Sequence, residues 1–388
     1  MKKILLSLSI LATIFTGCST SDDEETIQPV EGEITGSATT NRKFAFGNYT
    51  LNGIYTIESG VTVTFDAGST ITASATNGVD AILVKNGGKL IMNGTASQPI
   101  VLTESSQTPG SWGGIIMYGN APINGAGATT TKTSEDGLGL TYGSVTPNAA
   151  HNGGTLRYVR VEYAGKKITD GTSEMNGFSF YSVGSGTILE NLVSYKGADD
   201  GFEFYGGTVS ATNLISYGNF DDSFDWQDGW KGQLNSNWYA YQTGTGNFGM
   251  EIEASNNNNA FYPVISNITL KRAAGTSTEG GSSAAEYDAI QFKKQGNGDF
   301  TNIVISGYTN ASATAVRIQD VVTNTDQVNG SKIKLTNVKI NDGTSQFAGA
   351  GTVSVTFPSG QYTTSNTATG ASITNGAWST VGGVSLLQ

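Results

Sequence analysis

The stretch from residue 190 to residue 227 contains the same two segments twice. Glu190-Asn-Leu-Val-Ser-Tyr195 returns as Thr212-Asn-Leu-Ile-Ser-Tyr217, and Ala198-Asp-Asp-Gly-Phe-Glu-Phe-Tyr205 returns as Phe220-Asp-Asp-Ser-Phe-Asp-Trp-Gln227. The offset is 22 residues in both cases. Each copy is too short to bury an apolar face by itself, so consecutive copies must stack on one another.

Both segments have further relatives along the chain. The first family adds Leu156-Arg-Tyr-Val-Arg-Val-Glu-Tyr163, Ser266-Asn-Ile-Thr-Leu270, Thr301-Asn-Ile-Val-Ile305 and Thr336-Asn-Val-Lys-Ile340. The second adds Phe178-Ser-Phe-Tyr181, Met250-Glu-Ile-Glu253, Ile290-Gln-Phe-Lys293 and Val316-Arg-Ile-Gln319. A β-sandwich also has short alternating strands, but it would not repeat the same residues at the same offset. We therefore predict an all-β chain that forms a right-handed parallel β-helix, a solenoid.

The N-terminus predicts export and lipid anchoring. Residues 1–17 combine two lysines, an apolar run and small residues before the only cysteine, Cys18, which is typical of a signal peptide. Phe15-Thr16-Gly17-Cys18 resembles a bacterial lipobox, which implies acylation of Cys18; the alternative is an ordinary signal peptide with a buried cysteine. The acidic run 19–25 resembles the export signal of Bacteroidota lipoproteins, which implies the outer face of the outer membrane. Residues 18–40 are predicted to be a flexible, disordered tether.

Charge limits the range of partners. Residues 1–17 hold two of the 21 basic residues and none of the 32 acids, so the mature chain has 19 basic against 32 acidic residues, a net charge of −13. Such a surface repels nucleic acid and anionic lipid. With one cysteine, no intrachain disulfide can form, and stability must come from packing and backbone hydrogen bonds, with or without a metal. Residues 41–388 are predicted to be one β-helix domain with a long loop at 121–153 and a C-terminal cap at about 344–388.

Alternation along the second family predicts an acidic column. Its first and third residues are apolar and must face the interior, so the second residue faces outward. Glu203, Asp225 and Glu251 should then lie in neighbouring coils about 4.8 Å apart, on one exposed face. The 22-residue offset also places Asp199 near Asp221, and Asp200 near Asp222.

Three interpretations of these acids remain open. They can cap turns by accepting backbone N–H groups. They can bind calcium, because oxygen-only ligands suit a hard cation, with Asp199, Asp200, Asp221 and Asp222 as the ligands. They can also form a paired-carboxylate catalytic site drawn from Asp199, Asp200, Asp221, Asp222 and Asp225.

Other residues complete the candidate binding face. Trp230 follows a predicted strand and would offer an apolar surface for a sugar ring or a protein partner, unless it covers the solenoid beneath a loop over residues 228–248. Arg317 is the outward residue two coils beyond Glu251. With Glu203, Asp225 and Glu251, these two residues form the predicted ligand-binding set. The only histidine, His151, falls in the predicted long loop and is expected at the surface.

The chain resembles two groups of known proteins. Trp112-Gly-Gly-Ile-Ile, Asp199-Asp-Gly-Phe-Glu-Phe-Tyr-Gly-Gly207 and Asp221-Asp-Ser-Phe-Asp-Trp-Gln-Asp-Gly-Trp-Lys-Gly232 resemble β-helix surface lipoproteins of Bacteroidota, a family without a defined activity. A partial resemblance to polygalacturonases would match Asp221-Asp222 to a catalytic aspartate pair. Asn247-Phe248-Gly249 stands where those enzymes have histidine, and Gln319 stands where they have lysine.

These observations predict a non-catalytic, surface-exposed outer-membrane lipoprotein. Its β-helix would bind a glycan or an outer-membrane transporter or assembly complex, with Ca²⁺ stabilising the acidic turns. The first alternative is a carbohydrate-active enzyme, a polysaccharide hydrolase or lyase, that uses the acidic face. The second is a purely structural surface protein.

Overall fold

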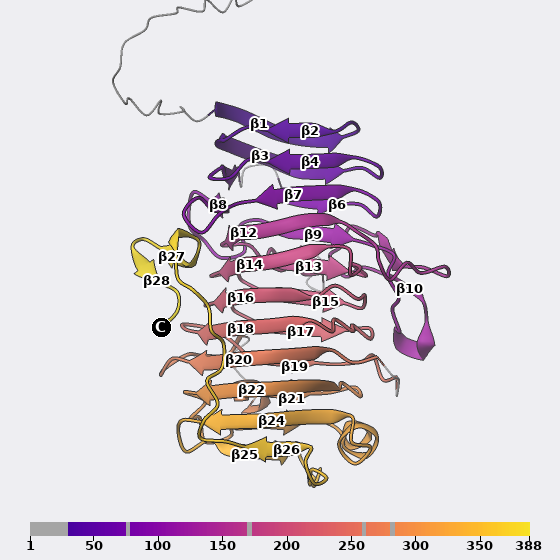
Figure 1. Cartoon of the computed structure of the whole chain (residues 1–388), viewed down its shortest axis with the longest axis vertical. Coiled ribbons are helices and arrows are strands. Elements are labelled where there is room, and N and C mark those ends of the chain that lie inside the picture. The colour runs from indigo at the N-terminus through magenta and orange to yellow at the C-terminus, as the bar shows by residue number, and fades with distance from the viewer. Residues whose placement is uncertain (1–29, 75–77, 169–172, 258–260, 280–283) are drawn as a thin grey trace, which may run out of the picture.

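The computed structural model describes residues 30–74, 78–168, 173–257, 261–279 and 284–388. They form a parallel β-helix, whose coils stack along one axis from β1 to β26 (Figure 1). One continuous sheet of 24 strands wraps around the axis, and its pairings divide it into three faces. This confirms the predicted fold class. The signal peptide, Cys18 and most of the predicted tether lie outside the described residues.

In the described residues, the N-terminal coils contain nine strands, of which the first (nine residues) and the third (eleven residues) are long and the others are short. They are β1 (Val30–Ala38), β2 (Arg42–Phe44), β3 (Gly47–Ile57), β4 (Thr62–Phe65), β5 (Thr70–Ala73), β6 (Ala81–Val84), β7 (Lys89–Asn93), β8 (Ile100–Glu104) and β9 (Ile115–Tyr118).

In the later coils, long strands bend across two of the faces. They are β12 (Gly154–Glu162), β14 (Ile188–Tyr195), β16 (Ala211–Tyr217), β18 (Asn235–Gln242), β20 (Val264–Arg272), β22 (Gly298–Ser306) and β24 (Ile333–Ile340), and the shorter β26 (Tyr362–Thr364) follows β24.

The third face, here called the short-strand face, continues from β6 and β9. Its later strands are β13 (Phe178–Tyr181), β15 (Phe202–Tyr205), β17 (Phe224–Gln227), β19 (Met250–Ile252), β21 (Ile290–Phe292), β23 (Thr314–Ile318) and β25 (Ser345–Gly349). The helices among the described residues are short: η1 (Ala126–Ala128), η3 (Ala284–Tyr287), α1 (Val321–Thr323), η4 (Asn324–Val328) and η5 (Ala377–Ser379). No helix in the described ranges has the length and apolar character needed to cross a membrane.

A column of asparagines makes the bend in the long strands. Six of these strands carry an asparagine with a positive φ of 56–60° at the bend, a conformation that asparagine tolerates better than most residues: Asn191, Asn213, Asn237, Asn267, Asn302 and Asn337. Their amides also bond from coil to coil; Asn213 donates to Asn191 Oδ1 at 2.9 Å and accepts from Asn237 Nδ2 at 3.0 Å. The asparagine that recurs in the repeat is therefore a corner residue.

Replacing one corner asparagine tests this assignment. Asn213→Ala should lower the free energy of unfolding by about 2–3 kcal/mol, because it removes two amide hydrogen bonds and forces alanine into the left-handed region. Asn213→Gly should lose less, because glycine adopts that conformation without strain. Urea titration measures both variants against Thr212→Ala, a neighbour in extended conformation. Equal stability of Asn213→Ala and Thr212→Ala would contradict the corner role.

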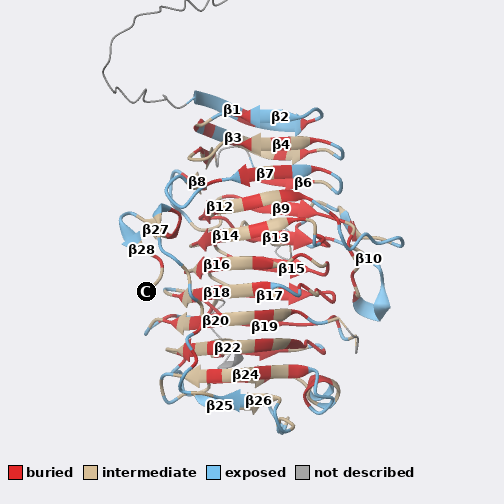
Figure 2. Cartoon of the chain, in the orientation of Figure 1, coloured by how far each residue is buried: buried red, intermediate tan, exposed pale blue. Residues whose placement is uncertain are grey.

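Stacked apolar side chains fill the interior. Phe178, Phe202 and Phe224 are fully buried and stack in succession, with ring centroids 4.9 and 5.7 Å apart. These are first-position residues of the second strand family, so the predicted alternation is confirmed. Burial is most complete in the middle coils, whereas β1, β2, β25 and β26 at the two ends carry more exposed residues (Figure 2).

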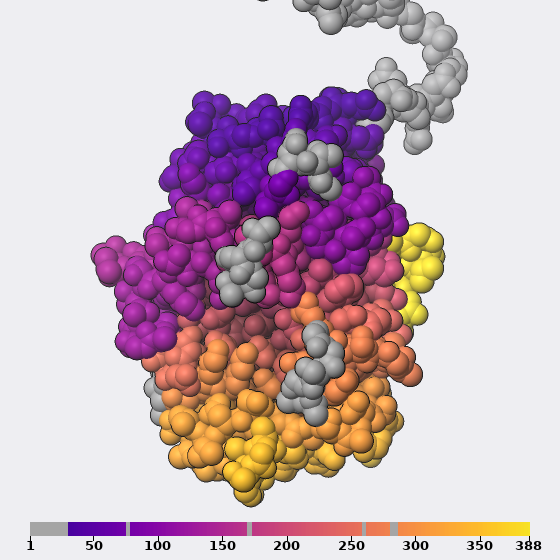
Figure 3. Space-filling view, turned by 180° about the vertical axis from the view of Figure 1, so that it is seen from behind, coloured from indigo at the N-terminus to yellow at the C-terminus, as the bar shows by residue number. Residues whose placement is uncertain are grey.

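Residues 121–153 form a hairpin insertion at the edge of the short-strand face. The predicted long loop contains an antiparallel pair, β10 (Thr131–Thr133) and β11 (Thr141–Gly143), and projects from the side of the solenoid (Figures 1 and 3). Buried Asp228 holds it in place, because it pairs with Lys132 at 3.1 Å and accepts a bond from the Tyr142 hydroxyl. The insertion is thus a structured wall beside the short-strand face.

Two predicted boundaries are wrong. The sequence predicts a tether that extends to residue 40, but Val30–Ala38 is strand β1 and pairs with β3, because Ile34 and Ala38 alternate into the core. It also predicts a C-terminal cap over residues 344–388. Only residues up to Thr364, the end of β26, complete the last coils, and residues 365–388 do not form part of them.

Residues 365–388, here called the C-terminal strap, run back along the outside of the solenoid (Figure 1). They end in the antiparallel pair β27 (Thr380–Val381) and β28 (Val384–Ser385). The backbone N–H of Thr369 bonds Asn302 Oδ1 at 2.8 Å, and that of Ser372 bonds Asn237 Oδ1 at 3.2 Å. The strap is therefore attached to the asparagine column over several coils.

Candidate functional site

The predicted acidic column lies on the short-strand face. Glu203 of β15 pairs in register with Asp225 of β17, which pairs with Glu251 of β19. Parallel register follows from the stacking of equivalent coils, so the three outward side chains lie in neighbouring strands, as predicted. The expectation that this face is exposed is wrong for Glu203, which is 4% exposed, whereas Asp225 and Glu251 are partly exposed. Residues of the hairpin insertion and of the turns before the strands line the same cavity as this column.

One aspartate in each of three turns supports the next coil. Asp200 Oδ1 accepts the backbone N–H of Asp222 at 2.8 Å, and Asp222 Oδ1 accepts that of Phe248 at 2.6 Å. Asp288 Oδ1 accepts the N–H of Thr314 at 2.6 Å in the same way. These aspartates therefore accept backbone N–H groups as the turn-capping interpretation requires, but the N–H groups belong to the next coil and not to a local Asx-turn.

Two buried carboxylate oxygens have no hydrogen-bond partner among the described residues, Asp199 Oδ2 and Asp225 Oδ1. Asp199 is only 2% exposed. A buried carboxylate without a donor loses its hydration without compensation, which is costly. Turn capping does not account for these two oxygens.

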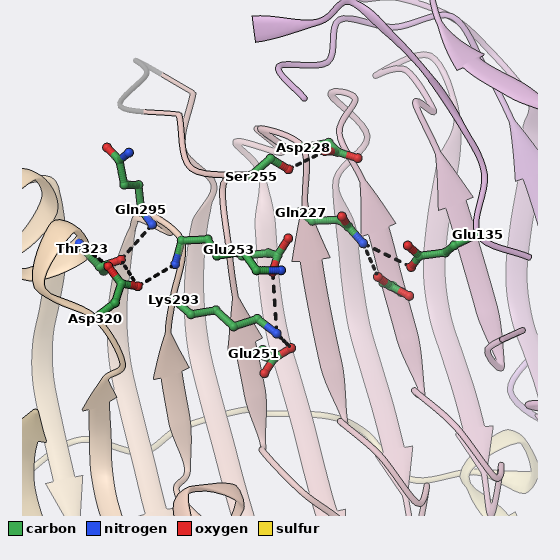
Figure 4. A network of polar contacts seen from close by, with 12 residues as sticks. Glu135, Gln227, Asp228, Glu251, Glu253, Ser255, Lys293, Gln295, Asp320 and Thr323 are labelled. Carbon is green, nitrogen blue, oxygen red and sulfur yellow. Dashed lines mark hydrogen bonds and ion pairs between the residues drawn. The ribbon is translucent and has the colours of Figure 1, made fainter. Parts of the chain in front are cut away.

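The acids enclose a cavity of about 490 Å³. Its lining includes ten acidic side chains and three lysines: Glu135, Glu174, Asp199, Asp200, Glu203, Asp221, Asp222, Asp225, Glu251, Glu253, Lys132, Lys293 and Lys294. Asn176, Tyr205 and Gln227 also line it, and Gln227 Nε2 lies 3.2 Å from both Glu135 Oε1 and Glu203 Oε1 (Figure 4). Acidic side chains thus far outnumber lysines around one cavity.

Burial and mutual repulsion shift the protonation of these acids. Burial, together with the neighbouring Asp221 carboxylate, raises the pKa of Asp199 well above its usual value. Burial and Glu203 do the same to the pKa of Asp225. Burial and the carboxylates of Glu279 and Glu251 raise the pKa of Asp221 to about 7. The cavity therefore favours protons or other cations over bare carboxylates.

Lysine provides part of the positive charge. Lys293 Nζ pairs with Glu251 and lies 3.6 Å from Glu253 Oε2, and Lys294 Nζ lies 2.7 Å from the same Glu253 oxygen (Figure 4). At the opposite wall, Lys132 reaches in from the hairpin insertion to Asp228. These ion pairs leave most of the ten acids without a lysine partner in the described part of the chain.

Sequence reasoning missed several residues of this site. Glu253 directly follows β19 and Lys293 directly follows β21, so both occupy the fourth position of the second strand family. The alternation that predicts an outward side chain at the second position also predicts one at the fourth position. The pair Asn237-Trp238 lies 24 residues after Asn213-Leu214 and is a further member of the first strand family. This signal would have predicted a strand, β18 (Asn235–Gln242), where the sequence analysis expects a loop over residues 228–248. Glu135 and Glu174 lie outside the repeat, and no sequence signal marks them.

Two predicted ligand-binding residues lie elsewhere. Trp230, for which the sequence leaves an exposed binding surface and a cover of the solenoid open, is 1% exposed; it stacks on Phe204 at 4.4 Å between centroids and donates its indole N–H to Val209 O at 2.9 Å. Arg317 occupies the outward column as expected but pairs with buried Asp288 at 2.9 Å, so its charge is used within the fold. It does not line the cavity.

His151, also expected at the surface, is instead buried. Its two ring nitrogens have no hydrogen-bond partner in the described ranges. Burial, and secondarily the charge of Lys89, lowers its pKa. It lies apart from the acidic cavity and does not line it.

The carboxylates meet the geometric requirement for cation binding. Oxygens from four sets of three acids each lie within 4.8 Å of one another: Glu174–Asp199–Asp221, Asp200–Glu203–Asp225, Asp200–Asp221–Asp222 and Asp222–Asp225–Glu251. All four residues predicted as metal ligands, Asp199, Asp200, Asp221 and Asp222, belong to these sets. The repeat brings them together because equivalent turns stack.

Fold and site together define a parallel β-helix with a partly open acidic cavity on one face. A family model described as the pectate-lyase-like β-helix domain matches residues 32–381, most of the chain, so the chain belongs to this family. Searches of curated proteins and of solved structures found no match.

Proposed function

We propose that this chain is an exported, lipid-anchored, non-catalytic protein whose acidic cavity binds calcium and whose calcium-loaded β-helix holds a partner at the cell surface. The observation that carries the calcium proposal is the cavity itself, where ten acids face three lysines. The buried, unpartnered oxygens Asp199 Oδ2 and Asp225 Oδ1 support it, because they belong to no turn cap among the residues that the structure describes.

The donor chemistry favours calcium. Every charged lining residue is Asp, Glu or Lys, so the cavity presents oxygen ligands to a cation. Calcium takes six to eight oxygens at about 2.3–2.6 Å in a flexible arrangement, whereas magnesium requires near-octahedral geometry and retains water. Asn176, which donates its amide N–H to Glu203 Oε2 at 2.7 Å, lines the same cavity.

The location of the protein is proposed from the first 25 residues. Acylation of Cys18 would anchor the chain to the outer membrane, and the acidic run behind it would direct the protein to the outer face. Display there would bring the cavity to a glycan or to an outer-membrane transporter or assembly complex, which are the partners we propose.

A thermal melt with and without calcium tests the proposed function. About 10 mM calcium should raise the melting temperature by several degrees over protein in chelator, because a cation at 100 times its Kd adds about 2.7 kcal/mol of stability. The Asp199→Asn/Asp225→Asn double variant should lose this response, and Asp299→Asn, whose carboxylate pairs with Lys334 on the surface, should keep it. An unchanged melt of the unmodified protein in calcium would exclude the calcium site.

Polysaccharide cleavage is the second candidate function. The family description names pectate lyase, and the acid sets within 4.8 Å of one another supply carboxylates close enough to act as a pair. Cleavage of an acidic or neutral polysaccharide by the calcium-loaded protein would establish this candidate. Binding of a glycan without cleavage would favour the first.

A further inference from the structure

The ring of His151, the only histidine in the chain, lies at the base of the hairpin insertion. A Cβ added at Gly119, just before the insertion, would lie 2.7 Å from His151 Nδ1. A Cβ added at Gly153, where the insertion ends, would lie 3.6 Å from His151 Cε1. The ring is therefore close both to the point where the chain leaves the solenoid and to the point where it returns.

The segment that carries His151 is attached to the turn after β13, residues 182–187. The backbone N–H of Ser185 bonds Ala149 O at 2.9 Å, and that of Gly186 bonds His151 O at 3.1 Å. These bonds hold the returning end of the insertion against the solenoid, directly beside the ring. Their exchange with solvent reports whether this base is closed or open.

The imidazole is buried without a partner. His151 is 5% exposed, and neither of its ring nitrogens has a hydrogen-bond partner among the described residues. A neutral imidazole in such a site forgoes one donor bond and one acceptor bond, whereas an imidazolium would forgo two charge-assisted donor bonds and the hydration of its charge. The closed base therefore accommodates the neutral ring better than the protonated one.

The charges around the ring do not favour its protonation. No ionisable side chain besides His151 occurs in the three described segments next to the ring, 119–121, 148–153 and 182–187. Tyr118, which ends β9, donates its hydroxyl hydrogen to Asp136. Burial, and secondarily the ammonium of Lys89 in β7, lowers the pKa of His151.

We propose that His151 is an acid-sensitive latch at the base of the hairpin insertion. The neutral ring keeps residues 148–153 closed on the turn 182–187, and protonation opens this segment, because the imidazolium must reach water. The insertion carries Lys132 and Glu135 to the acidic cavity, so the latch controls the attachment of one cavity wall. The latch does not depend on calcium binding.

The lowered pKa gives the direction of the pH dependence. Below the ordinary histidine pKa of about 6.5, the open base binds a proton that the closed base binds only at lower pH. The equilibrium constant for opening therefore rises as the pH falls below about 6.5, by up to about tenfold per pH unit. The cavity acids act in the opposite direction, because acids with a raised pKa stabilise the fold on acidification.

Hydrogen–deuterium exchange of the protein in chelator tests the latch, with each rate corrected for intrinsic exchange at its pH. Peptides that cover 144–154 and 182–188 should exchange about fivefold faster or more at about pH 5 than at about pH 7. A reference peptide over 211–227, which covers β16 and β17, should show no such increase. His151→Gln, whose side chain does not titrate, should remove the increase at the base.

Because the chain has one histidine, its protonation can also be measured directly. In tag-free protein labelled at histidine, the Cε1–Hε1 NMR signal should titrate below about pH 6.5. A histidine that titrates at its ordinary pKa, or an equal increase of exchange in His151→Gln and the unmodified protein, would overturn the latch. If circular dichroism shows that His151→Gln is unfolded, His151→Phe, which retains a neutral aromatic ring, takes its place with the same expected result.

Discussion

Trp230→Ala should lower the free energy of unfolding by about 3–5 kcal/mol, the range for removal of a large aromatic side chain from a packed core. The indole is 1% exposed, stacks on Phe204 and lies 5.9 Å from the Trp238 ring centroid. Its loss leaves a cavity between coils and also leaves Val209 O without its donor. Urea unfolding followed by tryptophan fluorescence and circular dichroism measures the effect.

Leu234→Ala is the matched control. This leucine lies four residues further along the same turn and is 80% exposed, so its removal should change the free energy of unfolding by no more than about 0.5 kcal/mol. If Trp230→Ala retained the stability of Leu234→Ala, Trp230 would not be a core residue, and its role as a ligand-binding surface would have to be reconsidered.

The melting temperature of the calcium-free protein should fall by several degrees as the pH rises from about 5 to about 8. Folding raises the pKa of Asp199, Glu203 and Asp225 well above their usual values and that of Asp221 to about 7. Between an unfolded-state pKa of about 4 and these folded-state values, the native state binds more protons than the unfolded state. The free energy of unfolding therefore decreases as the pH rises through this window, by up to about 1.4 kcal/mol per pH unit for each such acid.

Calcium should flatten this pH dependence, because a divalent ion replaces the protons as the positive charge of the cavity. Melts in chelator at about pH 5, 6, 7 and 8, repeated in calcium, measure both curves. The Glu203→Gln/Asp225→Asn variant should show a shallower decline in chelator, since two of the acids with a raised pKa are gone, while Asp299→Asn should follow the unmodified protein. A melting temperature that rises over the same pH range in chelator would contradict the burial of ionisable acids.

Repetition made much of the fold predictable. Because equivalent residues of successive coils pair in register, the 22-residue offset between Phe202 and Phe224 is also a strand pairing in space. The apolar alternation then determines which side chains face inward. The same two rules place Glu203 beside Asp225, and Asp200 beside Asp222, so the centre of the candidate site follows from the sequence as well.

Segments outside the repeat are harder to predict. The hairpin insertion brings Lys132 and Glu135 to the cavity, but neither has an equivalent in another coil. The strap at 365–388 has a Gly, Ser and Thr composition that resembles that of a terminal coil, which is why the sequence predicts a cap there. Its position depends on bonds to Asn237 and Asn302, which are far from the strap in the sequence.

The sequence by itself determined the solenoid, its register and the column of acids, because these depend on local alternation and on a fixed period. Only the tertiary structure decided that the acids share one partly covered cavity, that Trp230 is core and that Arg317 is paired within the fold. Exposure depends on what covers a strand, and the covering insertion here is as much as 96 residues away in the chain, as from Lys132 to Asp228. This covering also turns a row of surface carboxylates into a cavity whose acids have raised pKa values.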